Sequence, residues 1–328
     1  MKVFVTGGNG FVGLNVVSAL VSSGHQVVAI VRPGSNIAYL QPLGVEIVRG
    51  GLDDVSALVE AMRGADAVIH VAGNTSCNWR DLPKLEAVNV HGTRNVVEAA
   101  LAAGVRRLVF TSTTSTVGAY DDPARVADET EPLTGYRAQS PYAQTKQQAE
   151  RIVREAASRG LETIILNLAE VVGPYDYNLQ WGRMVLAVND DEVPFDPPGG
   201  ASFCAAKDVG MAHVAALTRG RSGERYLLGG PNIPFARFIA IIAETLGVRP
   251  KIPGTNYALM YRAIQVWEKL APVLPWKPPV EAYRMRVFGC TYYYDSGKAE
   301  RELGYRSAPV EEMVRDCVDW YRSNGFIR

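Results

Sequence analysis

Glycines spaced three residues apart, at Gly7, Gly10 and Gly13, close an apolar run at the start of this chain. Glycine at such a turn permits positive φ, its bare backbone lets another group come close, and the helix that follows points its first N–H groups at that place. Gly8, Gly10 and Gly13 give a second register of the same pattern. A turn of this kind between a strand and a helix predicts a site for the pyrophosphate of a dinucleotide, and the alternative is a tight turn without a ligand.

Short β-rich runs alternate with longer helix-like stretches through the first half of the chain. The predicted strands are 3–5, 27–31, 45–48, 67–71, 108–110 and 163–166. The stretches between them that we expect to be helical include 14–22, 55–62 and 88–103. Nearly continuous apolar strands indicate burial on both faces, so the alternation predicts a doubly wound α/β fold with a mostly parallel Rossmann sheet.

The alternation stops after Gly173 and Pro174, where prolines accumulate and helices become more frequent. We therefore predict a nucleotide-binding Rossmann domain at 1–170 and a smaller, interleaved substrate lobe at 171–328. Segments around 203–220 are expected to return to the first domain. The most membrane-like stretch, 259–274, contains charged side chains and is too short to span a bilayer, so we expect an amphipathic helix there.

Charge and cysteine usage exclude several classes of function. Lys plus Arg and Asp plus Glu both number 34 in 328 residues, so no net field draws nucleic acid or an anionic membrane surface. The cysteines are scattered without a C-x-x-C pair, which argues against a disulfide framework and against a zinc site. Because a predicted strand follows Met1 directly, we expect no signal peptide and a cytoplasmic protein with reduced thiols. The cysteines are Cys77, Cys204, Cys290 and Cys317.

The end of the second predicted strand indicates which dinucleotide is bound. Sites for NAD usually offer an acidic side chain to the ribose 2′-hydroxyl about twenty residues after the glycines. This chain has Arg32 there, followed by Ser35 and Asn36. A guanidinium forms charge-assisted, bidentate hydrogen bonds with a phosphate, so Arg32 favours NADP over NAD. The alternative is a solvated loop arginine, or one that stacks on adenine in an enzyme that accepts either cofactor.

Tyr142 and Lys146 stand one helical turn apart and therefore share a helix face. A neighbouring ammonium favours the phenolate of a tyrosine, so this pair can relay a proton. A hydroxyl-rich stretch at 111–115 ends a buried strand at its carboxyl edge, where ligands bind in open α/β sheets. Three separated elements thus converge on one predicted cleft and suggest hydride chemistry. A non-catalytic NADP-binding protein is the alternative, although such a protein does not need the Tyr142–Lys146 pair.

Nearly the whole chain resembles the extended short-chain dehydrogenase/reductases, which include the NAD-dependent epimerase/dehydratase family. The matching motifs, in the family's order, are TGGNGFVG at 6–13, HVAG at 70–73, NVHGT at 89–93, FTSTTSTVG at 110–118, SPYAQTK at 140–146 and VGP at 172–174. The resemblance implies a Ser/Thr–Tyr–Lys active site. Counting back from Gly118 places the catalytic hydroxyl on Thr113, with Ser112 as the alternative if the alignment slips by one residue. Asn89 resembles the family's helix asparagine, a structural and water-holding residue.

The resemblance thus implies catalytic roles for Thr113, Tyr142 and Lys146, and we expect no metal ion. The cofactor is expected to contact residues near the carboxyl ends of several strands. These are Gly7, Gly10, Phe11, Val12, Gly13, Arg32, Leu52, Asp53, Val71, Ala72, Gly73, Asn89, Thr111, Tyr142, Lys146, Leu168 and Val171.

Two departures from the family's pattern narrow the expected substrate. Members that act on nucleotide-sugars commonly carry an arginine before a Phe-x-x-x-x-Asp stretch, where it clamps the substrate pyrophosphate, and Ser202 stands there in this chain. The acidic residue often placed near adenine is also missing, since 50–54 reads GGLDD. Together with Arg32, these departures make the chain similar to the dihydroflavonol 4-reductase and 3β-hydroxysteroid dehydrogenase branches, which act on carbonyls of rather apolar molecules.

We therefore predict an oxidoreductase that uses NADP(H), with NAD as the other candidate, and reduces a ketone or aldehyde on a rather apolar small molecule. The alternatives are a nucleotide-sugar epimerase or dehydratase with tightly bound NAD, and a 3β-hydroxysteroid dehydrogenase-like enzyme at a membrane surface. We expect no nucleic-acid partner and no membrane contact, and we leave a homodimer open. His213 is expected to be a helix histidine with satisfied hydrogen bonds. Aromatic side chains of the second lobe either line the substrate site or pack in the core: Tyr175, Tyr177, Trp181, Phe195, Tyr257, Tyr261 and Trp267.

Overall fold

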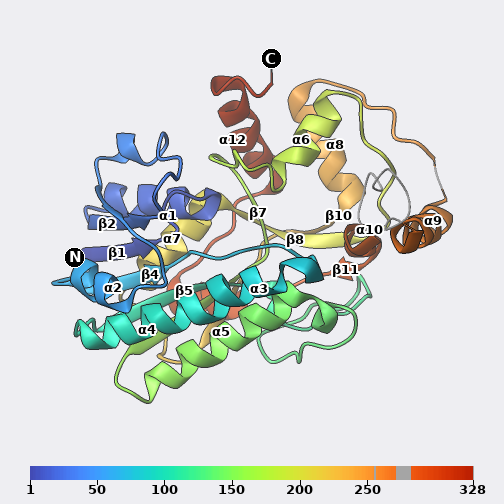
Figure 1. The fold of residues 1–328 in the computed structure, drawn as a ribbon. Coiled ribbons are helices and arrows are strands. Elements are labelled where there is room, and N and C mark those ends of the chain that lie inside the picture. Colours follow the sequence, from blue (N-terminus) through green and yellow to red (C-terminus); the bar gives the residue numbers. More distant parts are fainter. Residues whose placement is uncertain (255, 271–281, 328) are drawn as a thin grey trace.

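The computed structural model describes residues 1–254, 256–270 and 282–327, and within them seven parallel strands form the larger sheet. These strands are β1 (Lys2–Thr6), β2 (Gln26–Val31), β3 (Glu46–Arg49), β4 (Ala67–His70), β5 (Arg107–Thr113), β6 (Glu162–Leu168) and β9 (Arg225–Leu228). Their order is β3-β2-β1-β4-β5-β6-β9, so the chain winds outward in both directions from the neighbouring pair β1 and β4 (Figure 1). The predicted doubly wound parallel sheet is confirmed.

Helices cover both faces of this sheet. They are α1 (Phe11–Ser22) and α7 (Ala206–Ala215) on one face, and α2 (Val55–Met62), α4 (Thr93–Ala102) and α5 (Pro141–Ala157) on the other. Side chains of β1 alternate between the two cores: Val3 and Val5 pack toward α1 and α7, and Phe4 packs toward the opposite helices. Figure 1 shows α4 and α5 side by side across one face. Burial on both faces explains why these strands are apolar throughout.

One predicted helix begins differently in the structure. The stretch 88–103 was expected to be one helix, but Glu86–Gly92 forms a π-helical turn that follows α3 (Leu82–Leu85) and leads into α4. Asn89 in this turn accepts the N–H of Asn74 at 2.8 Å and donates to the Asn74 carbonyl at 2.9 Å. It also donates to the hydroxyl of Thr145 on α5 at 3.2 Å. These tertiary contacts hold the wider turn, and helix propensity alone could not reveal them.

A second, smaller sheet is formed by segments from the second half of the chain. Its strands are β7 (Glu170–Val172), β8 (Gly200–Ala205), β10 (Asn232–Pro234) and β11 (Thr291–Tyr292), and β8 pairs with the other three. Helices α6 (Gly182–Asn189), α8 (Phe235–Leu246) and α12 (Val310–Ser323) enclose a core with this sheet. Aromatic rings dominate that core, since the ring of Trp181 lies 5.3 Å from the rings of both Phe203 and Phe238.

The chain passes between the two sheets more than once. Strand β8 belongs to the smaller sheet, whereas α7 packs on α1 and β9 pairs with β6 at the edge of the larger sheet. Helix α11 (Gly297–Leu303) then packs against β9. The division into 1–170 and 171–328, with a return near 203–220, stays a proposal, because the larger sheet is completed only at Leu228.

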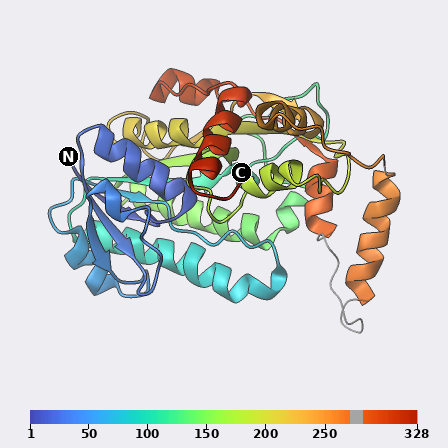
Figure 2. The same ribbon diagram turned by 90° about the horizontal axis from the view of Figure 1, so that it is seen from above.

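Helices α9 (Tyr257–Leu270) and α10 (Ala282–Gly289) pack on each other, and Figure 2 shows α9 at the margin of the molecule. Leu259, Val266 and Leu270 of α9 are 68%, 57% and 48% exposed. The amphipathic helix expected at 259–274 is confirmed up to Leu270, and residues 271–274 lie outside the described residues. In the described part of the chain, no helix has the length and apolar character needed to cross a membrane.

Candidate active site

The glycine turn between β1 and α1 is closed so tightly that a side chain fits at neither end. Gly7 has φ +69°, and a Cβ there would lie 2.6 Å from the backbone nitrogen of Ala72. A Cβ on Gly13 would lie 2.0 Å from the Gly7 carbonyl oxygen, which accepts the N–H of Gly10 at 3.0 Å. The structure therefore selects the register Gly7, Gly10 and Gly13 over the one that begins at Gly8. No side chain caps α1, so its first N–H groups remain available at the turn.

Two arginines lie together at the ends of β2 and β3. Arg32 follows β2 and is exposed, and the Nη1 atom of Arg49, which the sequence patterns did not single out, lies 3.5 Å from its carbonyl oxygen. Asn9 of the glycine turn donates to the Asn36 carbonyl at 3.1 Å, which ties the loop after β2 to the turn. Within the described part of the chain, the Arg32 guanidinium has no hydrogen bond or ion pair. A free cation thus stands next to the turn.

The last hydroxyl groups of β5 face different surroundings. Thr111 Oγ1 lies 2.8 Å from Nε2 of His213, whose Nδ1 is 2.8 Å from a helix carbonyl, so His213 is the satisfied helix histidine that we predicted. Burial lowers the pKa of His213 to about 4 and keeps it neutral. Ser112 is buried and donates to Oε1 of Glu150 at 2.5 Å, whereas Thr113 is partly exposed. Of the two candidate hydroxyls, that of Thr113 is therefore the accessible one.

Tyr142 and Lys146, in the first turns of α5, lie beside this strand end. Burial raises the pKa of the Tyr142 phenol, and a hydrogen bond with Thr113 opposes that rise. Lys146 is 4% exposed, and its Nζ atom donates to the carbonyl oxygen of Thr111 at 2.8 Å. Burial lowers the pKa of Lys146 to about 7, and the charge of Glu150 opposes this effect. The predicted trio of Thr113, Tyr142 and Lys146 is thus brought together at the carboxyl edge of the sheet.

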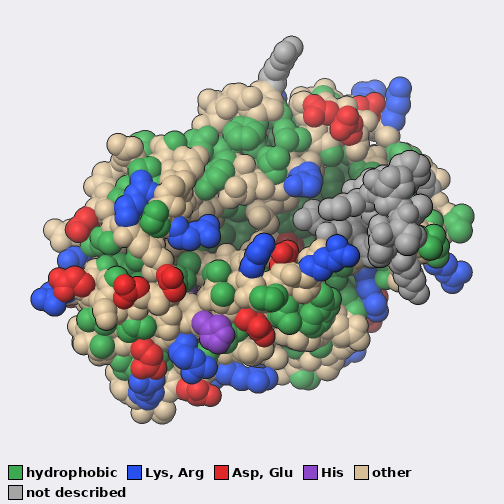
Figure 3. All heavy atoms as spheres, in the orientation of Figure 1, with side chains coloured by type: hydrophobic (Ala, Val, Ile, Leu, Met, Phe, Trp, Pro, Cys, Tyr) green, Lys and Arg blue, Asp and Glu red, His purple; other side chains and the backbone are tan. Residues whose placement is uncertain are grey.

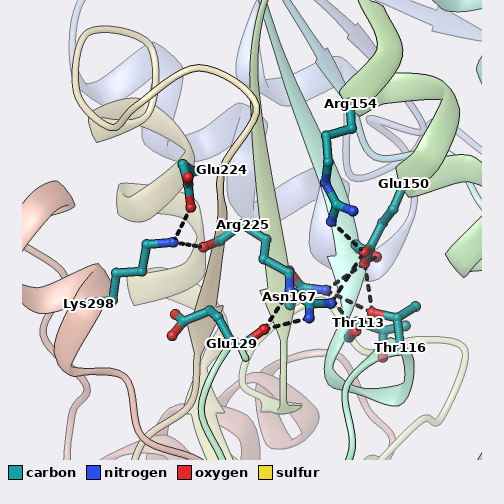
Figure 4. A network of polar contacts seen from close by, with 10 residues as sticks. Thr113, Thr116, Glu129, Glu150, Arg154, Asn167, Glu224, Arg225 and Lys298 are labelled. Atoms are coloured by element: carbon teal, nitrogen blue, oxygen red, sulfur yellow. Dashed lines mark hydrogen bonds and ion pairs between the residues drawn. The ribbon is translucent and has the colours of Figure 1, made fainter. Parts of the chain in front are cut away.

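Glu150 is a further buried group of this site that sequence reasoning missed. Oε1 of its carboxylate accepts three hydrogen bonds, from Ser112 at 2.5 Å and from Thr116 and Asn167 at 2.6 Å each. Figure 4 shows Glu150 with Thr116, Asn167 and Arg154. Its Oε2 forms ion pairs with Arg154 and Arg225 at 3.5 and 3.7 Å. The network ties α5 to the ends of β5 and β6, and so fixes the strand end beside Tyr142. Glu150 stands one helical turn after Lys146, a spacing that could have identified it.

The comparison with known families agrees with this geometry. The sequence model described as "NAD dependent epimerase/dehydratase family" matches residues 3–229. The chain belongs to that family. It is therefore an NAD(P)-dependent oxidoreductase of the extended short-chain dehydrogenase/reductase type, as the resemblance of its motifs implied.

Individual members of the epimerase/dehydratase family match along their full length. A putative dihydroflavonol 4-reductase of Synechocystis sp. is 32% identical over 99% of this chain and 96% of that protein. A 2-alkyl-3-oxoalkanoate reductase of Stenotrophomonas maltophilia is 30% identical over 96% of this chain and 98% of that protein. A solved dTDP-glucose 4,6-dehydratase double mutant from Streptomyces venezuelae, with NAD bound, is 25% identical with a TM-score of 0.79, over 100% of this chain and 99% of that chain.

The other residues of this chain that we expect to contact the cofactor lie around the carboxyl ends of the parallel strands. The N–H groups of Val71 and Ala72 donate to the carbonyl and the hydroxyl of Thr6, both at 3.2 Å. Leu168 ends β6 and pairs with Thr113 of β5. The others belong to the glycine turn, to the segment after β3, to the segment after β4 or to β7: Phe11, Val12, Leu52, Asp53, Gly73 and Val171. Direct contact with a cofactor stays a prediction for each of them.

Ser202, the residue at the family's arginine position, does not face a ligand site. It is 1% exposed, and its hydroxyl oxygen accepts the N–H of Gly230 at 3.1 Å. No group that could clamp the pyrophosphate of a nucleotide-sugar is therefore present at this position. Among the described residues, no cluster of three or more His, Cys, Asp or Glu side chains is arranged to hold a metal ion.

Packing accounts for several of the aromatic residues that were candidates for the substrate site. Trp181 packs against the aromatic core of the smaller sheet, and Phe195 packs against Tyr257 with ring centres 5.4 Å apart. Tyr177 has a different position, because its hydroxyl donates to the Asn9 carbonyl at 2.6 Å and thus contacts the glycine turn. The sequence interpretation of these residues as core therefore holds for Trp181 and Phe195.

Groups without any sequence motif border Tyr142 on its other side. Glu170 of β7 and Tyr283 of α10 are both close enough to Tyr142 to act on its pKa. Both also interact electrostatically with Arg137, which precedes α5. Oε2 of Glu170 accepts the indole N–H of Trp181 at 2.8 Å, and burial raises the pKa of this carboxyl. The face of the molecule drawn in Figure 3 has a hollow, with hydrophobic side chains inside it and Lys or Arg side chains at its rim.

Proposed function

We propose that this protein is an NADPH-dependent reductase that converts a ketone or aldehyde on a rather apolar small molecule into an alcohol. The observation that carries the proposal is Tyr142, whose pKa is raised by burial and whose hydroxyl meets that of Thr113. A phenol that keeps its proton at neutral pH is suited to donate it to a carbonyl oxygen. The two relatives that are named reductases support this reaction type.

The residues of the glycine turn fit a dinucleotide. Gly7 and Gly13 leave the backbone uncovered, and the uncapped start of α1 offers N–H groups to a pyrophosphate. Arg32 and Arg49 offer two guanidinium groups where a site for NAD usually has a carboxylate, which supports NADP as the preferred form. The bound nicotinamide would supply the hydride.

The chain's own residues orient the carbonyl and handle the proton. The Thr113 hydroxyl donates a hydrogen bond to the carbonyl oxygen, and Tyr142 transfers its proton to that oxygen as negative charge develops there. The protonated form of Lys146 would stabilise the tyrosinate that remains and would hold a ribose hydroxyl of the bound cofactor. The Glu150 network keeps the end of β5, and with it Thr113, in position against α5.

Cofactor consumption tests the proposal directly. The purified protein is incubated with NADPH or NADH and a panel of apolar ketones, aldehydes and nucleotide-sugars, and loss of the reduced cofactor is followed by absorbance. We expect NADPH to be oxidised with the apolar carbonyl compounds and NADH to be used less well. No oxidation with any carbonyl compound would contradict the reductase.

A nucleotide-sugar epimerase or dehydratase is the second candidate, favoured by the similarity to the NAD-bound dTDP-glucose 4,6-dehydratase. Ser202 makes this candidate less favourable, because enzymes that act on nucleotide-sugars commonly have a phosphate-clamping arginine at this position, where this chain has a buried hydroxyl. A competition titration with UDP, UDP-glucose and a bulky aromatic ketone in the presence of NADP separates the two candidates. Micromolar binding of UDP without binding of the ketone, or NAD that stays bound through purification, would favour the epimerase or dehydratase.

A 3β-hydroxysteroid dehydrogenase-like enzyme at a membrane surface is the third candidate. The exposed side chains of Leu259, Val266 and Leu270 on α9 favour it. Flotation of the protein with liposomes is the test, and absence of binding removes this candidate.

A further inference from the structure

Arg137, just before the helix α5 that carries Tyr142, is a partly buried cation that forms no ion pair with any described residue. It lies in the helical turn Arg137–Gln139, five residues before Tyr142. Its Nη1 donates to the hydroxyl of Tyr294, and in the described part of the chain no carboxylate forms an ion pair with it. Glu170 interacts with Arg137 electrostatically without forming an ion pair with it, and an oxygen of its carboxyl accepts the indole N–H of Trp181. An arginine withdrawn from water without a counter-ion is costly, which makes a second role for it informative.

Aromatic rings surround this guanidinium. Four tyrosines lie close enough to interact with its charge: Tyr136, Tyr283, Tyr292 and Tyr294. The Cζ atom of Arg137 lies 4.9 Å from the ring centre of Tyr292 and 5.8 Å from that of Tyr294. Tyr294 links this cluster to the reaction centre, because its hydroxyl accepts from Arg137 and donates to the carbonyl oxygen of Thr114 at 3.2 Å. One tyrosine hydroxyl thus connects Arg137 to the residue that follows Thr113.

The hydroxyl of Tyr292 is a second unused donor in this cluster. Tyr292 is 2% exposed, and its hydroxyl has no hydrogen-bond partner among the described residues. Buried hydroxyl groups are nearly always hydrogen-bonded, so one that lacks a partner beside a ligand site points to a ligand. Arg137 and Tyr292 thus place one cationic and one neutral donor near each other, with the guanidinium carbon 4.9 Å from the centre of the Tyr292 ring.

We infer that Arg137 and the Tyr292 hydroxyl bind the carboxylate of an oxo acid whose carbonyl group lies at Tyr142. The inference rests on the reductase function proposed above and specifies its substrate class. A planar guanidinium and a phenol O–H suit the two oxygens of a carboxylate, and the tyrosine rings suit an alkyl chain. A single guanidinium among tyrosines favours a monoanion over a nucleotide diphosphate. The name of the 2-alkyl-3-oxoalkanoate reductase is consistent with this class.

The chemistry of the step balances with the carboxylate unchanged. Hydride from NADPH adds to the ketone carbon, the electron pair of the C=O π-bond moves to oxygen, and Tyr142 supplies the proton, which solvent later restores. The products are a hydroxy acid and NADP⁺. Arg137 takes no part in bond making; it holds one end of the substrate while the other end reacts.

A matched pair of substrates tests the inference: 3-oxodecanoate and its methyl ester, which lacks the charge. We expect the wild-type protein to reduce the acid with the higher kcat/KM. Arg137→Gln should lower kcat/KM for the acid about 100-fold and for the ester no more than about fivefold, since only the acid loses a charge-assisted contact. For Arg137→Lys, we expect kcat/KM for the acid to lie between the values of the wild type and Arg137→Gln, because the charge remains and the planar guanidinium is lost. Arg151→Gln, on the exposed side of α5, is the control that removes the same charge.

A second variant separates binding from structure. Tyr292→Phe removes only a hydroxyl that the protein does not use, so we expect an unchanged or slightly higher unfolding temperature. The same variant should lower kcat/KM for the acid about tenfold, the value of one hydrogen bond to a charged group, and leave the ester nearly unaffected. Tyr293→Phe, at the next position of the chain, is the control. Equal losses for acid and ester in both variants would show a purely structural role and overturn the inference.

Binding without turnover distinguishes failure of the inference from failure of the reductase. Decanoate and decanamide are titrated by calorimetry into the protein with NADP⁺, and we expect Arg137-dependent binding of decanoate alone. Reduction of the ester without any binding of decanoate would overturn the carboxylate site and leave the reductase standing. Arg137-dependent binding of decanoate without reduction of any carbonyl would support the site and contradict the reductase. Tighter, Arg137-dependent binding of UDP would show that the site binds a nucleotide diphosphate and would overturn the assignment of a carboxylate.

Discussion

The cofactor side and the substrate side of the candidate active site differ in what defines their shape, which is backbone on one side and side chains on the other. On the cofactor side, backbone atoms define the shape: Gly7 and Gly13 are in such close contact with neighbouring backbone that no side chain fits. On the proposed substrate side, Arg137, Tyr283 and Tyr292 come from separated parts of the chain, and side chains define the surroundings. Backbone constraints recur as short motifs, whereas a pocket made of side chains has no fixed spacing in the sequence. Sequence motifs of the cofactor side therefore identify the family. The substrate has to be inferred from the side chains that the folded structure brings together on the other side.

Tyr142 lies between the two sides, and its substitution should have the largest effect on activity. Tyr142→Phe keeps the ring and removes the proton, so we expect turnover to fall about 10²- to 10⁴-fold. Cofactor affinity and unfolding temperature should change little, because neither side loses its own contacts. Steady-state kinetics, a cofactor titration and thermal unfolding measure the three quantities. Retained turnover would move the proton donor to another residue.

Arg32→Asp acts on the cofactor side alone. The change replaces a partner of the 2′-phosphate by a repulsive charge, so NADPH binding should weaken by about 2–3 kcal/mol, while NADH binding stays the same or improves. Dissociation constants for both cofactors give the answer, and the KM of the carbonyl substrate should not move. Arg63→Asp, at an exposed position after α2, serves as the control. Equal losses for NADPH and NADH would show that Arg32 does not recognise the phosphate.

Glu150→Gln tests the buried network that connects the two sides. The protonated form of Lys146 is the useful one, so activity should fall as the pH rises through its pKa of about 7. The charge of Glu150 raises that pKa, and its removal should therefore shift the fall in activity to lower pH. His70 also faces Lys146, but burial lowers its pKa to about 3, so it stays neutral over this range.

The pH profile of kcat/KM distinguishes this effect of Glu150 from a loss of stability. Replacing the carboxylate should also cost about 1–3 kcal/mol of unfolding free energy, because it leaves Arg154 and Arg225 without their shared partner. Glu155→Gln, exposed on the same helix, should change neither quantity. A profile of Glu150→Gln with an unshifted alkaline limb would mean that Glu150 acts through structure only.

Leu259→Ser should have the smallest effect, since the residue lies outside both sides of the site. Its side chain is 68% exposed on α9, so the unfolding free energy should change by no more than about 0.5 kcal/mol. Turnover of a water-soluble carbonyl substrate should be unchanged. A clear loss of turnover would show that α9 contributes to the substrate side.

Sequence patterns were sufficient to predict features that depend on one strand or one turn. The alternation of apolar strands and helices predicted the parallel sheet, and the glycine spacing predicted the turn before α1. Thr113 and Tyr142 were predicted to meet because the carboxyl ends of parallel strands lie at one edge. The π-helical turn around Asn89 was missed, since it depends on contacts with Asn74 and Thr145, which are distant in sequence or on another helix.

The sequence by itself determined the family and the sheet and predicted the reaction centre, because each depends on residues close in sequence or on backbone geometry that tolerates few residue types. Only the tertiary structure showed that Ser112 is buried while Thr113 is accessible, and that Glu150 is buried one helical turn from Lys146. It also brought Arg137 near a Tyr292 hydroxyl that has no partner among the described residues. Those outcomes depend on which side chains from remote segments share a small volume and on which of them lose water there. Burial and pairing of that kind leave no periodic trace along the chain.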